Sequence, residues 1–328
     1  MRRRYFIVLA GGAAVAASPA LRGAAAQGSR PARVGFISGV DQPAAADFVA
    51  ALREGLQSFG YVEPGTLRVD AAFADYDLAR IPALVKAMEQ EGVGVIVTHA
   101  AAAPIVVKSE RSAPAVYEFS ADPVSIGLAA DLAHPLFNAT GITLMRSELW
   151  GKRLELLHEI APDIHRIAVI ANPLHGGEHL ERADLAAKAN LLGIAVSFFS
   201  TPNRAELDRA LTAIAADPPQ AIAAFSESFV VDNRAYIVNF AMSRRIPVVA
   251  GWSVLATAGS LFTYGPRLAD SYRRTAYFVD RILKGAKPAE LPIEQPTVLE
   301  LVVNLGSAKI LGIDIPPALL ARADTVIE

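Results

Sequence analysis

Short apolar segments alternate with amphipathic helical patterns along the chain, and this alternation is the feature that most restricts the fold. Residues 33–38 (RVGFIS) are typical of a buried strand. In the following segment, 44–59, Phe48, Leu52 and Leu56 recur at a spacing of four, which indicates one apolar face of a helix. Strands that alternate with helices form parallel sheets with right-handed crossovers. The sequence therefore predicts an α/β fold.

The alternation runs through two cycles, and a length of 328 residues suits two domains of roughly 120–150 residues. The other expected strands are 67–74, 93–99, 113–120, 141–144, 166–172, 195–200, 221–228 and 246–251. Helical patterns cover 78–91, 100–111, 148–160, 179–192, 204–216, 232–244, 269–283 and 307–311. We expect 141–144 to open the second cycle and 261–265 (LFTYG) to pass from one domain to the other. Another helix start is expected after Asp122.

The N-terminus has the pattern of an export signal. Three arginines, Arg2 to Arg4, precede an apolar run at 5–17, and Ala24 to Ala26 fit a cleavage site. The apolar run is shorter than the ~20 residues that span a bilayer, which disfavours a retained anchor. We therefore predict a signal peptide at 1–26 and a periplasmic protein, exported by the general secretory or the twin-arginine route.

Composition and motifs exclude several function classes. A net charge of -2 gives no reason to expect a nucleic-acid partner, and the absence of cysteine excludes disulfides and a cysteine nucleophile. Nucleophile-elbow, phosphate-loop and H-E-x-x-H motifs are missing, so we expect neither an enzyme nor a cofactor. The segment 173–182 (PLHGGEHLER) leaves two interpretations, a metal site or, as we favour, a solvated loop.

Residues at the carboxyl ends of the expected strands are the candidates for a binding site, because ligands of open α/β sheets gather there. These residues are Ser38, Thr98, His99, Ser120, Asp122, Asn172, Ser226, Glu227 and Trp252.

Several longer segments carry a family resemblance. They are ADPVSIGL (121–128), NATGIT (138–143), 152–173, LFTYGP (261–266) and, above all, 273–317. The chain resembles the ABC-transporter substrate-binding family, in the subgroup similar to tryptophan- and tyrosine-binding components. This resemblance implies a type I periplasmic-binding fold with two doubly wound lobes around a cleft. We expect the N-terminal lobe to comprise 33–140 and about 264–290, and the C-terminal lobe 141–263 and about 291–328.

The resemblance suggests how the N-terminal lobe would hold a zwitterion. Helix starts after the strands at 33–38 and 93–99 suit a carboxylate, with Ser38 and Thr98 as hydroxyl donors. Asp122 would face a cationic group, or would simply cap the following segment. His99 and Glu118 depart from the pattern of the family, so the identity of the ligand stays open.

In the C-terminal lobe, each candidate also has an ordinary structural interpretation. Asn172 is expected to bind ligand or to form an Asx turn, and Ser226 and Glu227 to line the cleft or face solvent. Trp252 and Tyr264 are the aromatic candidates for stacking on the ligand, or else core residues.

The leading hypothesis is a monomeric solute-binding protein that closes on a small molecule, an amino acid or an aromatic acid, and delivers it to an inner-membrane ABC permease. A ligand-sensing subunit of a membrane receptor is one alternative. Another is an exported hydrolase in which Ser38, His99 and Glu227 converge. A transcriptional regulator of the same fold is excluded by the export signal and by the lack of a helix-turn-helix.

Overall fold

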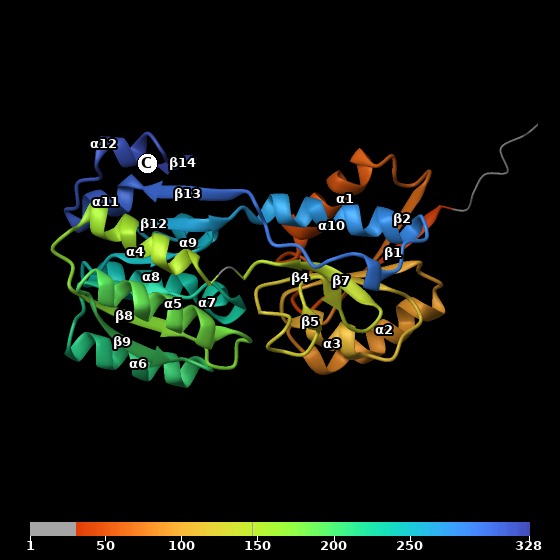
Figure 1. Cartoon of the computed structure of the whole chain (residues 1–328), viewed down its shortest axis with the longest axis horizontal. Helices are drawn as coiled ribbons and strands as arrows, with labels where there is room; N and C mark the ends of the chain where they lie inside the picture. The colour runs from red at the N-terminus through yellow and green to blue at the C-terminus, as the bar shows by residue number, and fades with distance from the viewer. Residues whose placement is uncertain (1–30, 146) are drawn as a thin grey trace, which may run out of the picture.

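The computed structural model describes residues 31–145 and 147–328, which form two α/β lobes on separate sheets. Figure 1 shows the lobes side by side, with helix α10 (Leu268–Leu283) extending from their junction over the N-terminal lobe. The expected signal peptide, 1–26, lies outside the described residues. Within those residues, every helix is too short or too polar to cross a bilayer.

The N-terminal lobe is built on a parallel sheet. Its strand order is β2 (Leu67–Phe73), β1 (Ala32–Ser38), β3 (Val95–His99), β4 (Ala115–Phe119) and β7 (Ala139–Thr143). Because side chains alternate along a strand, Val97 of β3 packs on one face and Ile96 on the other. The first face is covered by α1 (Ala46–Ser58) and α10, and the second by α2 (Ile81–Gln90) and α3 (Ala103–Lys108). The 3₁₀ turns Leu78–Arg80 and Ala100–Ala102 precede α2 and α3, and a small hairpin pairs β5 (Ala129–Asp131) with β6 (His134–Pro135).

The C-terminal lobe has a larger sheet. Its strand order is β14 (Thr325–Ile327), β13 (Leu299–Asn304), β12 (Phe262–Pro266), β11 (Val248–Ala250), β10 (Ala221–Ala224), β8 (Arg166–Ala171) and β9 (Ala195–Ser200). Neighbouring strands are parallel except for the antiparallel pair β12 and β13.

Helices cover both faces of this sheet, as its apolar strands require. One face packs against α4 (Leu149–Ile160), α5 (Glu178–Leu191), α11 (Leu305–Leu311) and α12 (Pro317–Leu320). The other packs against α6 (Arg204–Ala216), α7 (Ser228–Asp232), α8 (Arg234–Ser243) and α9 (Ser253–Thr257). The predicted α/β architecture of two lobes is confirmed.

Three local predictions are wrong. The strand expected to open the second cycle is β7, which pairs with β4 inside the first sheet. The segment expected to pass between domains, 261–265, lies mostly in β12 of the second sheet, and the passage comes at Arg267, after β12. Asp122 is followed by turns rather than by a helix, because Pro123 and Gly127 frame a tight loop in which Gly127 has a φ of 71°.

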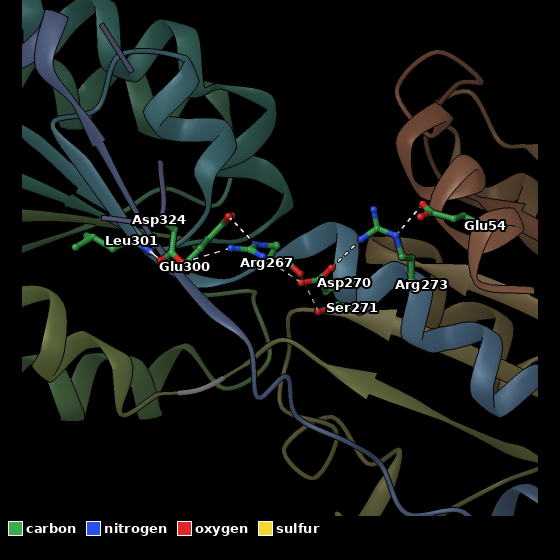
Figure 2. A network of polar contacts seen from close by, with 8 residues as sticks. All are labelled: Glu54, Arg267, Asp270, Ser271, Arg273, Glu300, Leu301 and Asp324. Atoms are coloured by element: carbon green, nitrogen blue, oxygen red, sulfur yellow. Dashed lines mark hydrogen bonds and ion pairs between the residues drawn. The ribbon is translucent and has the colours of Figure 1, made fainter. Parts of the chain in front are cut away.

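Ion pairs cross the junction where β12 leads into α10 (Figure 2). Arg267 lies 3.2 Å from Glu300 of β13, 3.5 Å from Asp324 and 3.7 Å from Asp270 of α10. The same Asp270 pairs with Arg273 at 2.7 Å, and Arg273 reaches Glu54 of α1 at 2.7 Å. A continuous series of charges therefore connects the C-terminal sheet with two helices of the N-terminal lobe.

Candidate functional site

The carboxyl ends of the strands of both sheets meet at the junction of the lobes. After β4, Ser120 places its Oγ 3.0 Å from Nε2 of His175, in the loop after β8. Beside it, the N–H of Asp122 donates to the carbonyl of Gly176 at 3.0 Å. Because β4 and β8 belong to different lobes, the two edges on which the sequence places a site face each other.

Apolar side chains of the two lobes also share one cluster. One hydrophobic cluster includes Phe48 of the N-terminal lobe and Trp252 of the C-terminal lobe. Val40 and Phe73 from the first lobe, and Phe229 from the second, pack against it and are partly buried. A single apolar cluster with several aromatic side chains therefore contains residues of both lobes.

Ser38 and His99 lie together at the carboxyl edge of the first sheet. Oγ of Ser38 is 2.9 Å from Nε2 of His99 and accepts the N–H of Val40 at 3.2 Å. The imidazole packs against two phenyl rings, with centroids 5.7 Å from Phe36 and 4.7 Å from Phe48. Burial lowers the pKa of His99 to about 4, so the ring is neutral at pH 7.

Glu118 extends this polar row on the same face of the sheet. It is the register neighbour of His99 on β4 and is only 2% exposed. Its Oε1 has no hydrogen-bond partner among the described residues, and burial raises its pKa to about 8. Burial raises the pKa of Tyr272 of α10, and the nearby carboxylate of Glu118 raises it further. A neutral carboxyl group at this position can donate or accept one hydrogen bond.

The two other N-terminal candidates have different surroundings. Thr98 points to the opposite face of β3 from His99, and its buried Oγ1 has no partner within the described part of the chain. Asp122 holds the turn that follows it, since its carboxylate accepts the N–H of Ser125 at 2.9 Å and also the Ser125 hydroxyl. Its expected pairing with a cationic group stays a prediction.

The C-terminal candidates at the end of β8 and β10 mainly cap their own loops. Glu227 accepts the N–H of Phe229 at 2.9 Å and of Val230 at 2.8 Å, at the start of α7. Burial raises the Glu227 pKa, and these amides and the side chain of Asn172 oppose the rise. Asn172 also accepts the N–H of Leu174 at 3.0 Å, as in an Asx turn.

Ser226 and Trp252 follow the adjoining strands β10 and β11, whereas Tyr264 lies within β12. Oγ of Ser226 accepts the N–H of Gly251 at 2.8 Å. Trp252 is buried in the cluster that connects the lobes, whereas Tyr264 packs against the other face of the sheet. The two aromatic candidates are therefore not brought together.

Arg153 is the functional candidate that the sequence analysis missed. It lies on α4, is only 3% exposed, and donates its Nε–H to the carbonyl of Tyr264 at 2.8 Å. Its guanidinium carbon lies 4.4 Å from the ring centroid of Trp150, while Nη1 has no hydrogen-bond partner in the described structure. Burial lowers the pKa of Arg153 to about 10, although the charges of Glu181 and Asp184 raise it. The guanidinium therefore stays charged at pH 7.

Local signals for the missed residues do exist. Trp150, Arg153, Leu154 and Leu157 follow the spacing of one helix face, so the arginine interrupts an apolar stripe. Glu118 likewise interrupts the buried strand β4.

His175 was assigned to a loop or a metal site. Among residues 31–145 and 147–328, no group of three or more His, Asp or Glu side chains is arranged to hold a metal.

The comparisons with known proteins agree with the fold of two lobes. The family model for ABC transporter substrate binding proteins matches residues 33–327. A search of curated proteins gave no match. A crystal structure of a conserved domain protein from Vibrio cholerae is 27% identical, with a TM-score of 0.81, and the match covers 90% of this chain and 99% of that one.

Two further structures share the fold at lower identity. An ABC domain from Streptococcus pneumonia, in complex with L-Trp, is 22% identical with a TM-score of 0.82, over 90% of this chain and all of that one. A ligand-free, open substrate binding protein from Clostridium difficile is 20% identical with a TM-score of 0.71, over 90% of this chain and 99% of that one. The type I periplasmic-binding fold expected from the sequence is confirmed.

Proposed function

Because the chain belongs to the family of ABC transporter substrate binding proteins, we propose that it captures a small solute by closure of its lobes and delivers it to an ABC permease. The observation that carries the proposal is the meeting of the two carboxyl edges, where Ser120 and His175 connect the lobes. On either side of this junction, Glu118 and Arg153 each bury a polar atom that lacks a partner within the described residues. A bound molecule would satisfy such atoms.

The proposed solute is an amino acid or an aromatic acid. The apolar cluster that the lobes share, which includes Phe48 and Trp252 and packs against Phe73 and Phe229, suits a side chain of that kind. The pneumococcal relative of the same fold was solved with L-Trp. We place the lobe boundaries after β7, before α10 and between Glu294 and β13, so that Arg267 lies at the hinge.

The proposal also fixes a location and partners. The protein would act as a monomer in the periplasm, after removal of residues 1–26, and its outer lobe faces would contact the permease. The hydrolase alternative loses support, because Ser38 is fully buried and Glu227 is bound to the amides of α7 in the other lobe.

Ligand-dependent thermal stabilisation tests the proposal. Protein expressed without residues 1–26 would first be denatured to remove bound molecules and then refolded. Its melting temperature would be measured with amino acids, aromatic acids and other metabolites. A solute at 100 times its dissociation constant stabilises the folded state by about 2.7 kcal/mol. Mass spectrometry of the material that co-purifies with the protein would identify a natural solute. A folded protein without any co-purifying molecule and without any shift in the panel would refute solute capture.

Uptake measured in vesicles with the permease separates import from sensing. Import predicts transport that depends on this protein, whereas a sensing subunit would bind the same solute without supporting uptake.

A further inference from the structure

We propose that Arg153 binds the carboxylate of a monoanionic solute when the lobes close. This inference rests on the solute-capture function and assigns the negative end of the solute to the C-terminal lobe. In this proposal Arg153, and not the backbone amides of the N-terminal lobe, is the main partner of the carboxylate.

The first step of the argument is the incomplete bonding of Arg153. Its Nε–H is bonded to the Tyr264 carbonyl and one face lies on Trp150, so the guanidinium is held in a fixed orientation. Its buried Nη1 has no acceptor among the described residues. A buried guanidinium with a free N–H group is costly unless an anion or another acceptor completes it.

The second step is the position of the guanidinium. Nη2 lies beside Gly251, the residue after β11, so closely that a Cβ atom there would be 2.5 Å from it. Oγ of Ser226, which follows β10, lies at the same distance from that position. The absence of a side chain at Gly251 thus leaves space for the guanidinium at the carboxyl edge of the sheet, next to the junction with the other lobe.

The third step concerns the nearest acids. Glu181 of α5 accepts the indole N–H of Trp150 at 3.0 Å, and no hydrogen bond or ion pair between Glu181 and Arg153 is found in the described structure. Burial raises the pKa of Glu181 to about 7, so its charge is only partial at neutral pH. Asp184 and Glu148 also act on Arg153 from a distance. A single arginine among acids favours a carboxylate over a doubly charged phosphate.

The experiment compares acids with their uncharged amides. Titration calorimetry on stripped protein would use L-tryptophan and L-tryptophanamide, L-leucine and L-leucinamide, and benzoate and benzamide. For each pair that binds, we expect the acid to bind about 30-fold more tightly than the amide, since truncating a buried charge pair costs roughly 2 kcal/mol or more. Arg153→Gln should abolish this preference, and Arg153→Lys should restore part of it.

Arg166→Gln is the matched control, because Arg166 begins β8 at the opposite edge of the same sheet and pairs with Asp217 at 2.6 Å. It should keep the full preference for acids. Circular dichroism would establish that each variant is folded, and Arg153→Lys provides the test if Arg153→Gln does not fold.

The outcomes separate this inference from solute capture. Equal binding of acid and amide, or a preference that survives in both Arg153 variants, would overturn the role of Arg153 and leave capture intact. The same holds if the co-purifying molecule carries no anionic group. If no carboxylate binds and no molecule co-purifies, both the inference and the proposed function fail.

Discussion

Oγ of Ser120 and Nε2 of His175 lie 3.0 Å apart, and this hydrogen bond joins the two lobes. Ser120→Ala removes it without adding bulk. A hydrogen bond of this kind contributes about 0.5–1.5 kcal/mol, so the variant should populate open forms more often. Small-angle scattering of ligand-free protein should show a larger radius of gyration. Ser58→Ala, which removes a hydroxyl from α1 far from the junction, is the control.

The same contact predicts that closure depends on pH. Burial lowers the pKa of His175 from 6.5 to about 4 in this arrangement, so an opened, hydrated His175 binds a proton more readily. The contribution to closure is therefore complete above pH 6.5 and is lost as the pH falls towards 4. Scattering at both pH values should show expansion at the lower one. His175→Gln should reduce that expansion, and an unchanged expansion in the variant would contradict the role of His175.

Glu118 predicts a pH dependence of folding stability. Its folded pKa is about 8 against an ordinary 4.5, so the folded state keeps a proton that the unfolded chain releases. The free energy of unfolding should therefore fall as the pH rises from 4.5 to 8, by about 1.4 kcal/mol for each unit of pH. Glu118→Gln should be the more stable protein at pH 8 in urea unfolding. His99 and Tyr272, which face Glu118, remain in both proteins. Equal slopes against pH in the two proteins would refute the assignment.

Asp122 gives a direct test between its two interpretations. The structure gives its carboxylate the N–H and hydroxyl of Ser125 as partners, so Asp122→Ala should cost about 1 kcal/mol of stability. Asp122→Asn keeps one acceptor oxygen and should cost less stability. If Asp122 only holds its turn, this variant should leave the affinity for a bound amino acid nearly unchanged. Calorimetry and urea unfolding on both variants measure the two effects. A more than tenfold loss of affinity in a stable Asp122→Asn protein would instead support the pairing with a cationic group.

The sequence predicted the elements well wherever a local pattern determines them. The helix expected at 204–216 is α6 with the same bounds, because Asn203 caps it and its apolar residues recur at helical spacing. The strand β12 was misassigned because its neighbour β13 pairs with it antiparallel from a later segment of the chain. Nothing local to residues 261–265 reveals that pairing.

The site was predicted to the level of the strand ends and not to that of the contacts. Ser38 and His99 were both selected, and the structure brings them together. Arg153 and Glu118 were not selected, since a charged residue within an apolar pattern is normally a local exception. Their meaning depends on which groups the fold leaves unpaired, and that is a property of the packed lobes.

The charges at the hinge give the last prediction. Arg267 and its partners Asp270 and Asp324 are each more than a third exposed, and such pairs contribute about 0.2–1 kcal/mol. Arg267→Gln removes its bonds to Glu300, Asp324 and Asp270 together (Figure 2), so we expect a loss of about 1 kcal/mol in dilute buffer.

This loss should shrink as salt is raised to about 1 M, where the Debye length is about 3 Å. Urea unfolding at low and high salt measures the difference between wild type and variant. Arg281→Gln, on the exposed surface near the other end of α10, should change stability little at either salt concentration. If Arg267→Gln loses the same stability at both salt concentrations, the contribution of Arg267 comes from packing of its aliphatic stem. Charge interactions between exposed groups do not survive such screening.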